Sequence, residues 1–280
     1  MKTIVYGLIA LSLALSSCVM PLTVAQPTAT EIPPTETALP TETGIPTDTL
    51  EPSETLTPSD TPEPSETPTR TPTATEPPFD PAASYGSPTI FDSMDNNNNW
   101  VQSNGQLPDT DYIRLALGGG RLHVTGKQPN FDTWWFTWPS PSNFFIQMTV
   151  HVDNCSGKQA YGMIVRGPQE ISVTSARGYI LTFSCDGSYR LVRLDRTSPY
   201  TTEELIPWTE SDHIDAGSNK TNTMGIRMQG ADITIYANGF EVHDLDDDTF
   251  SAGRFGVFVN AGAPGNFTFS IDELAYWNLD

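Results

Sequence analysis

The acidic side chains have the clearest catalytic potential in this sequence, because glycosidic bonds are commonly hydrolysed by two carboxylates on opposite sides of the bond. The richest acidic run is Asp244-Leu245-Asp246-Asp247-Asp248, which follows a predicted hairpin strand, and Glu203-Glu204 forms a second cluster. We interpret both as solvated loop residues, because both lie in polar stretches. The sequence contains no Gly-x-Ser-x-Gly motif of the kind that marks many serine hydrolases. The pattern therefore favours a protein without catalytic activity.

A metal site is the second kind of chemistry to consider. The spacing of the four histidines is not that of zinc ligands. Asp92 and Asp95 lie near the start of the aromatic-rich part of the chain, and Asp272 lies near its end. First and last strands often pair in β-sandwiches, and calcium prefers oxygen ligands. The three aspartates could therefore hold a structural calcium ion; the alternative is that they cap turns and strand ends. We expect no other cofactor.

The elements that would position these residues are β-strands. From residue 85 to residue 280, apolar and polar side chains alternate repeatedly, for example over 144–152, 179–183, 224–228 and 255–259. Asp186-Gly187 and Asn238-Gly239 are favoured hairpin turns between such runs. A phase break between Ile271 and Leu274 predicts a β-bulge around Asp272-Glu273. We expect about a dozen short strands in one all-β antiparallel sandwich covering residues 85–280.

Two cysteines support this topology. If 161–166 pairs antiparallel with 178–184, Cys155 before the first strand meets Cys185 after the second. Such a bridge persists in an oxidising, exported setting. We therefore predict a disulfide between Cys155 and Cys185; the alternative is two buried thiols.

The N-terminal residues direct the chain to export. Lys2 precedes an apolar run from Ile4 to Leu15, which is typical of a secretory signal and too short to span a membrane. The sequence Leu15-Ser16-Ser17-Cys18 resembles the lipobox of bacterial lipoproteins. This resemblance implies that residues 1–17 are removed and that the Cys18 thiol carries a diacylglycerol, which anchors the exported protein to the membrane. The alternative is an ordinary cleaved signal peptide.

Residues 18–84 have the composition of a linker, rich in Thr, Pro, Glu and Ser. Eleven acidic residues against the single Arg70 account for about half of the net charge of −20. Low hydrophobicity and one-sided charge predict a disordered, extended segment that holds the folded domain away from the membrane. A chain this acidic repels nucleic acid, which we exclude as a partner.

The turns and strand ends of the last two-thirds of the chain resemble those of concanavalin A-like jelly-roll domains. The residues that carry the resemblance are, in order, Phe91-Asp92, Cys155-Ser156-Gly157, Tyr161-Gly162, Cys185-Asp186-Gly187, Tyr189-Arg190-Leu191, Trp208, Asn238-Gly239, Phe255-Gly256 and Ile271-Asp272. Laminin-G-like and 3-keto-disaccharide-hydrolase-like modules of bacterial surface proteins are the more similar families. The resemblance implies two curved sheets with carbohydrate on the concave face. The Glu-x-Asp-x-x-Glu motif of catalytic relatives is absent here.

Aromatic rings are the best candidates for sugar binding, because a flat ring stacks on the apolar face of a pyranose. Trp134, Phe136 and Trp138 share one face of a predicted strand, which we assign to the core. Trp135 then faces the concave sheet, and Tyr200 could form a rim. The predicted carbohydrate-binding residues are Trp135, Arg166, Thr182, Tyr200 and Trp208, the alternative being ordinary sandwich packing.

These expectations combine into one predicted function. We expect a non-catalytic surface lipoprotein whose jelly-roll domain binds a glycan or another cell-wall or surface partner. The alternatives are an atypical glycoside-processing enzyme of the same fold and a structural or protein-binding ectodomain.

Overall fold

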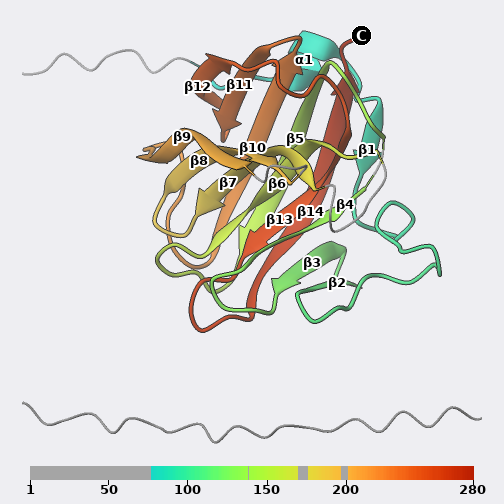
Figure 1. The fold of residues 1–280 in the computed structure, drawn as a ribbon, viewed down its shortest axis with the longest axis vertical. Helices are drawn as coiled ribbons and strands as arrows, with labels where there is room; N and C mark the ends of the chain where they lie inside the picture. The colour runs from blue at the N-terminus through green and yellow to red at the C-terminus, as the bar shows by residue number, and fades with distance from the viewer. Residues whose placement is uncertain (1–76, 138, 170–175, 197–200) are drawn as a thin grey trace, which may run out of the picture. The chain divides into compact units, whose positions relative to one another are not determined.

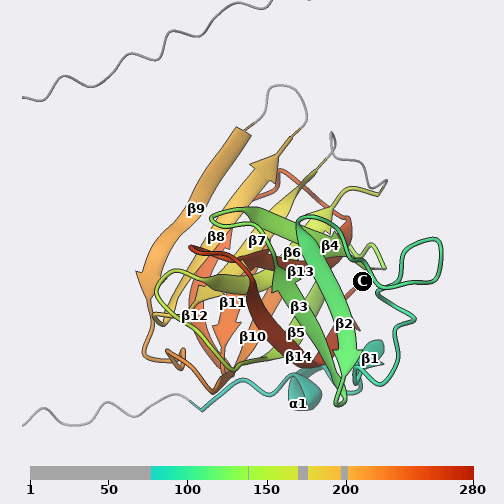
Figure 2. The same cartoon turned by 90° about the horizontal axis from the view of Figure 1, so that it is seen from below.

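The computed structural model describes residues 77–137, 139–169, 176–196 and 201–280. These residues form fourteen strands and one short helix, arranged as two antiparallel sheets packed face to face (Figures 1 and 2). The prediction of an all-β antiparallel sandwich is therefore confirmed. Cys18, the predicted linker up to residue 76, Trp138 and Tyr200 lie outside the described residues. Within them, no helix is long and apolar enough to cross a membrane.

Sheet A has eight strands and forms the lower layer in Figure 2. Its strands are, in spatial order, β12 (Phe240–Asp246), β11 (Asp232–Ala237), β10 (Lys220–Gln229), β5 (Phe144–Val152), β14 (Phe267–Asn278), β3 (Arg121–Gly126) and β2 (Ile113–Gly118), with β1 (Ile90–Asp92) also paired to β14. The register of β14 against β5 shifts between Ile271 and Glu273, which confirms the predicted bulge.

Sheet B has six strands and forms the upper layer in Figure 2. Its spatial order is β4 (Asp132–Phe136), β13 (Arg254–Asn260), β6 (Ala160–Gly167), β7 (Arg177–Ser184), β8 (Ser188–Asp195) and β9 (Thr201–Glu210). The predicted hairpin turns are present: Gly187 joins β7 to β8 with a φ of 85°, and Asn238 and Gly239 join β11 to β12 with φ values of 50° and 84°. Glycine and asparagine tolerate this left-handed backbone conformation at little cost.

The main core lies between the sheets. Side chains of alternate residues, such as Tyr179, Leu181 and Phe183 on β7, point from sheet B toward Ile146 and Met148 on β5 of sheet A. All five are buried. Each fully buried apolar side chain of this size contributes about 1.5–3 kcal/mol to stability. The alternation of apolar and polar residues in the sequence thus indicates which face of each strand points into the core.

The residues just before β1 form a strap across the outer face of sheet A. The ring of Phe79 stacks on Tyr236 at a centroid distance of 4.9 Å and lies 5.5 Å from that of Phe145. The helix α1 (Pro81–Tyr85) follows, and Asp80 caps it by accepting a hydrogen bond from the Ala82 amide. The packing on sheet A therefore includes Phe79, six residues before the domain start at residue 85 that we expect from the sequence.

The predicted disulfide between Cys155 and Cys185 is confirmed. The two cysteines are separated by 30 residues in sequence, and the pairing of β6 with β7 brings them to the same end of sheet B. In the chain-entropy model, closing a loop of this length stabilises the fold by about 3–4 kcal/mol.

Candidate functional site

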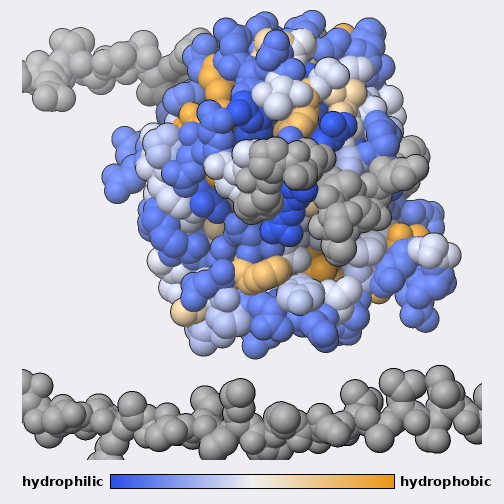
Figure 3. All heavy atoms as spheres, in the orientation of Figure 1, coloured by the Kyte–Doolittle hydropathy of each residue, from blue (hydrophilic) through white to orange (hydrophobic). Residues whose placement is uncertain are grey.

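The outer face of sheet B carries the candidate site, because most of the predicted sugar-binding residues belong to this sheet. One cross-strand row on this face runs, in register, through Trp134, Phe258, Gly162, Thr182 and Arg190. Figure 3 shows this side of the molecule, which is mostly hydrophilic with small apolar patches.

The predicted orientation of the β4 tryptophans is wrong. Trp135 packs against the main core, and its indole Nε1 donates a 2.9 Å hydrogen bond to the carbonyl of Trp100. Trp134 and Phe136, which we assigned to the core, lie with a second apolar cluster on the outer face of sheet B. Because both faces of β4 are apolar, periodicity alone does not tell which face is inside.

Arg166 is buried inside the fold and does not line the outer face. Its backbone has a φ of 50°, at the point where β13 and β6 change register. The guanidinium donates to the carbonyls of Phe250 and Ser142, at 2.8 and 2.9 Å. Burial lowers the pKa of Arg166. This arginine therefore braces two loops, and its assignment to the sugar site is corrected.

Thr182 faces outward as predicted, but it is fully buried. Its hydroxyl accepts a 3.3 Å hydrogen bond from Nε of Arg190. Thr182 is therefore a residue that positions Arg190 and is not itself accessible to a ligand.

Most of the acidic residues that we interpreted as parts of solvated loops lie in strands. Glu203 and Glu204 belong to the edge strand β9. Asp247 accepts a 2.6 Å hydrogen bond from the Tyr179 hydroxyl and pairs with Arg193, and its side chain is only 8% exposed. Burial and this hydrogen bond raise the pKa of Tyr179 to about 12. Asp247 is therefore a structural residue of the loop after β12.

The suggested calcium ligands do not come together. Both carboxylate oxygens of Asp92 are taken by hydrogen bonds at 2.9–3.0 Å, from the Met94 amide, the Asn99 side chain and the Trp100 indole. Asp95 accepts from Ser93, and Asp272 pairs with Arg121 at 2.9 Å. Among the described residues no group of three metal-ligating side chains is formed. The capping alternative describes Asp92 correctly.

An open cavity of about 360 Å³ lies beside β4, and we call it the aromatic pocket. The rings of Tyr112 and Phe131 stack at its mouth, 5.0 Å apart and 27° from parallel. These rings are 49% and 42% exposed, among the most exposed large apolar side chains in the described structure. Trp134 and Asp132 also line the pocket. Two accessible rings, a tryptophan and a carboxylate thus border one cavity.

Polar contacts hold the two loops that carry these rings. The Lys127 ammonium donates to Asp109 and to the Thr110 carbonyl, at 2.5 and 2.6 Å. The Gln128 side chain donates to the Asp111 carbonyl at 2.8 Å. These contacts join the loop before β2 to the loop after β3, which carry Tyr112 and Phe131 respectively.

A second cavity, of about 410 Å³, lies at the β9 side of the same face, and we call it the Trp208 pocket. The ammonium of Lys158 and the guanidinium of Arg190 lie 4.6 and 4.7 Å from the centroid of the Trp208 ring, close enough for cation–π attraction. Asn130, Ser156, Gln159 and Asn260 are further polar residues of the lining. Of the predicted sugar-binding residues that the structure describes, Trp208 lines this cavity and Trp135 is among the residues that line the aromatic pocket.

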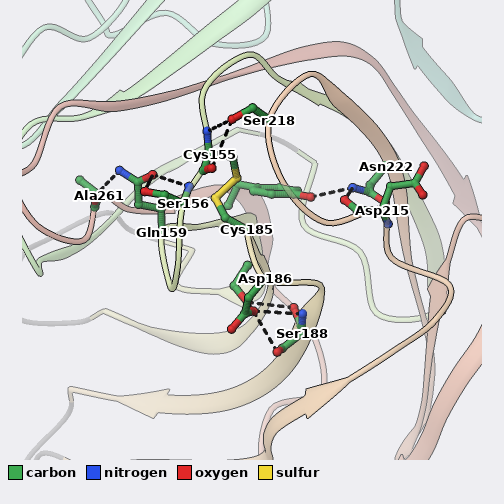
Figure 4. Close-up of a disulfide and its surroundings, with 12 residues drawn as sticks. Cys155, Ser156, Gln159, Cys185, Asp186, Ser188, Asp215, Ser218, Asn222 and Ala261 are labelled. Atoms are coloured by element: carbon green, nitrogen blue, oxygen red, sulfur yellow. Dashed lines mark hydrogen bonds between the residues drawn. A yellow bond between two sulfur atoms is a disulfide. The ribbon is translucent and has the colours of Figure 1, made fainter.

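The residues that follow Cys155, from Ser156 to Ala160, line part of the Trp208 pocket. Figure 4 shows Ser156 and Gln159 beside the disulfide. Gln159 connects three segments there, because its side chain accepts from the Ser156 amide at 3.0 Å and donates to the Ala261 carbonyl at 3.2 Å, while its own carbonyl accepts from Cys185 at 3.0 Å. Lys158 precedes Gln159 in the same loop and pairs with Asp186 at 2.6 Å. Burial would raise the pKa of Asp186, but hydrogen bonds from Lys158, Ser184 and Ser188 outweigh it and lower the pKa to about 2.

The linings of the two pockets are in direct contact through Asp132 and Asn260. Asp132 lines the aromatic pocket and accepts a 2.6 Å hydrogen bond from Asn260, which lines the Trp208 pocket. A guanidinium nitrogen of Arg190 lies 3.9 Å from the same Asp132 oxygen. The pockets are therefore adjacent parts of one surface.

Sequence reasoning did not identify Tyr112 and Phe131. Each lies in a polar loop next to a strand. An aromatic residue in a polar loop is often exposed, and this is the one local signal in the sequence that could have indicated them. Their stacking joins two loops that flank β2 and β3, and no spacing in the sequence indicates it.

Comparison with known proteins gives structural likeness only. No family model and no curated protein matches the chain. Solved structures with a similar backbone include a carbohydrate-binding module from Bacillus subtilis, with 18% identity, a TM-score of 0.45, and coverage of 61% of this chain and 91% of that one. A family 16 endo-glucanase from Bacteroides ovatus has 11% identity, a TM-score of 0.49 and coverage of 67% and 99%. The kappa-carrageenase of Pseudoalteromonas carrageenovora has 9% identity, a TM-score of 0.48 and coverage of 67% and 92%. The function of this chain therefore rests on its own residues.

Proposed function

We propose that this protein binds carbohydrate at the aromatic pocket, without cleaving it. The observation that carries the proposal is the stacked, half-exposed pair of Tyr112 and Phe131 at the mouth of a cavity that Trp134 also lines. Flat, accessible rings offer the apolar surface on which the C–H face of a pyranose stacks, and a carboxylate such as Asp132 accepts hydrogen bonds from sugar hydroxyls. Exposed aromatic rings are otherwise an unfavourable surface.

Binding without hydrolysis follows from the lining groups. Asp132 is the carboxylate among the residues that line the aromatic pocket, and the lining of the Trp208 pocket contributes none. Asp132 is engaged by the Asn260 amide. Glycoside hydrolysis needs a second carboxylate across the bond, so the described lining residues favour recognition over cleavage.

We further propose that the domain is displayed on a membrane surface by a lipid on Cys18 and by the acidic linker that follows. The strap at 78–86 lies on the outer face of sheet A, whereas residues of the outer face of sheet B, such as Trp134 and Arg190, line the two pockets. The chain thus enters the domain on the face opposite to the pockets. This arrangement supports presentation of the pockets away from the anchor.

Screening of the full chain on a glycan array, followed by titration of the hits, tests the binding proposal. We expect dissociation constants in the micromolar to millimolar range, about 4–8 kcal/mol of binding free energy, from one open site with a few stacking rings. Phe131→Ala should weaken binding by about tenfold, because it removes an exposed stacking surface.

Phe91→Ala is the matched control for that variant. Phe91 is 56% exposed but lies on β1 in sheet A, away from the aromatic pocket. Equal loss of affinity in Phe131→Ala and Phe91→Ala, or hydrolysis of a bound glycan by the wild-type chain, would contradict the proposal.

A further inference from the structure

Arg190 occupies an unusual position between two carboxylates. One terminal nitrogen lies 3.9 Å from Asp132, and the other lies 3.8 Å from Glu204. Both separations exceed the length of a direct hydrogen bond, which is about 2.7–3.2 Å for nitrogen and oxygen. The Arg190 side chain is nevertheless only 17% exposed. The guanidinium is therefore largely enclosed, yet its two terminal nitrogens make no direct hydrogen bond to either carboxylate.

Other contacts explain why Arg190 does not close either gap. Its Nε donates to the Thr182 hydroxyl at 3.3 Å, and its guanidinium lies 4.7 Å from the Trp208 ring centroid. These two contacts fix the position of the guanidinium from the side of the sheet and from the side of the ring. A preorganised donor of this kind loses little side-chain entropy when a ligand binds.

A hydroxyl group fits such a gap chemically. It accepts a hydrogen bond through its oxygen and donates one through its proton. A sugar hydroxyl between Arg190 and Asp132, or between Arg190 and Glu204, would accept from the guanidinium and donate to the carboxylate. The arrangement thus recognises neighbouring hydroxyls, while the Trp208 ring beside it offers an apolar surface.

The local charge argues for an uncharged ligand. Lys158 and Arg190 are the cations beside Trp208, and their ion-pair partners are Asp186, Asp132 and Glu204. Three carboxylates against two cations leave no net positive charge to attract a uronate or a sulfate ester. The acidic character of the whole chain, with a net charge of −20, disfavours a polyanionic ligand further.

We infer that the Trp208 pocket is a second saccharide subsite, and that the ligand is an uncharged linear oligosaccharide whose chain spans this pocket and the aromatic pocket. This inference rests on the proposed carbohydrate binding at the aromatic pocket. Asp132 joins the two subsites, because it lines one pocket and faces Arg190 and Asn260 of the other. The chain would cross the strands of sheet B from β4 toward β9.

The test is a chain-length series measured by calorimetry with the full chain in detergent. The probes are gluco-, xylo- and manno-oligosaccharides of two to six units, together with oligogalacturonates of the same lengths. For a neutral series that binds, affinity should rise by about tenfold or more once the chain is long enough to reach the second pocket, and then level off. Oligogalacturonates should bind more weakly at every length.

Two variants should remove the gain from chain length and leave disaccharide binding intact: Trp208→Ala and Arg190→Gln. Glu204→Gln, in an exposed side chain of an edge strand, should reduce the gain without affecting folding. Arg227→Gln is the matched control, because Arg227 also donates from Nε to a threonine, Thr234, at 3.3 Å, but lies in sheet A. Retained disaccharide binding shows that each variant is folded.

The outcomes separate the inference from the function beneath it. A full chain-length gain in Trp208→Ala and Arg190→Gln would overturn the second subsite and leave the aromatic pocket as the single site. Stronger binding of oligogalacturonates than of neutral chains would overturn the ligand class. The expected results are binding about tenfold weaker at every length in Phe131→Ala, and loss of the chain-length gain with disaccharide binding retained in Trp208→Ala and Arg190→Gln. No binding of any glycan by the wild-type chain would overturn the proposed function itself.

Discussion

Individual residues on the outer face of sheet B are held by charge pairs and not by packing alone. Lys158 and Asp186 belong to different loops, one before β6 and one between β7 and β8, and their 2.6 Å pair joins them. The Asp186 carboxylate also accepts from the hydroxyls of Ser184 and Ser188, at 2.5 and 2.9 Å. Such charge-assisted hydrogen bonds are shorter and stronger than neutral ones. One aspartate thus fixes the hairpin and the loop that border the Trp208 pocket.

The lowered pKa of Asp186 predicts a dependence of stability on pH. The ordinary value is 3.8 and the folded value is about 2, so the folded state holds this proton more weakly than the unfolded state. The stabilisation is therefore fully present above about pH 4 and is lost as the pH falls toward about 2. The difference in unfolding free energy between wild type and Asp186→Asn should shrink over this interval in urea titrations.

Asp248→Asn serves as the control for that prediction, since it removes one exposed negative charge. A difference between wild type and Asp186→Asn that stays constant from about pH 5 to about pH 2 would contradict the role assigned to the Lys158–Asp186 pair.

At the scale of elements, the sequence predicts strands well where one face is buried and the other is wet. The alternation over 144–152 and 224–228 corresponds to β5 and β10, and the Asp-Gly and Asn-Gly turns lie where expected. The disulfide followed correctly from the pairing of β6 with β7. Each of these predictions depends on local patterns or on antiparallel neighbours.

The same reasoning fails where a strand is covered on both faces. All residues of β6 are buried, and a second apolar cluster covers part of the outer face of sheet B. β4 has apolar residues on both faces. The sequence pattern is therefore the same whether Trp134 or Trp135 faces the core. Periodicity also cannot predict which residues line the site. Tyr112, Phe131 and Trp208 come from separate loops and strands. Only the tertiary arrangement brings them to one face.

The strap before β1 is an element whose contribution can be measured. Phe79 is partly buried against Phe145 and Tyr236, and Trp277 donates from its indole to the Gly86 carbonyl at 2.8 Å. Phe79→Ala should lower the free energy of unfolding by about 1–3 kcal/mol, because it exposes this aromatic cluster. Denaturant unfolding of the full chain measures the effect. Phe91→Ala, which removes an exposed ring, should cost much less; equal losses would show that the strap does not stabilise the domain.

At the scale of the whole molecule, the two outer faces of the sandwich have different surroundings. The outer face of sheet A receives the strap that follows the linker, and the outer face of sheet B carries the two pockets. The two sheets lie between these outer faces. A ligand bound on sheet B would therefore not clash with the chain where it enters the domain at sheet A. This separation suits a domain that is tethered at one face and binds at the other.

The proposed tether makes one prediction about the location of the protein. Acyl chains on Cys18 would supply the membrane affinity, because each buried methylene contributes about 0.8 kcal/mol and the acidic linker is not attracted to anionic lipid. Cys18→Ser should therefore move the protein from the membrane fraction to the soluble exported fraction, as measured by fractionation after a high-salt wash. The double variant Cys155→Ser/Cys185→Ser is the matched control, since it removes the bridge seen in the domain but keeps the anchor, and it should stay with the membranes. Membrane association of Cys18→Ser that survives the salt wash would mean that another segment or partner holds the protein, because salt removes electrostatic adsorption but leaves a buried hydrocarbon chain in place.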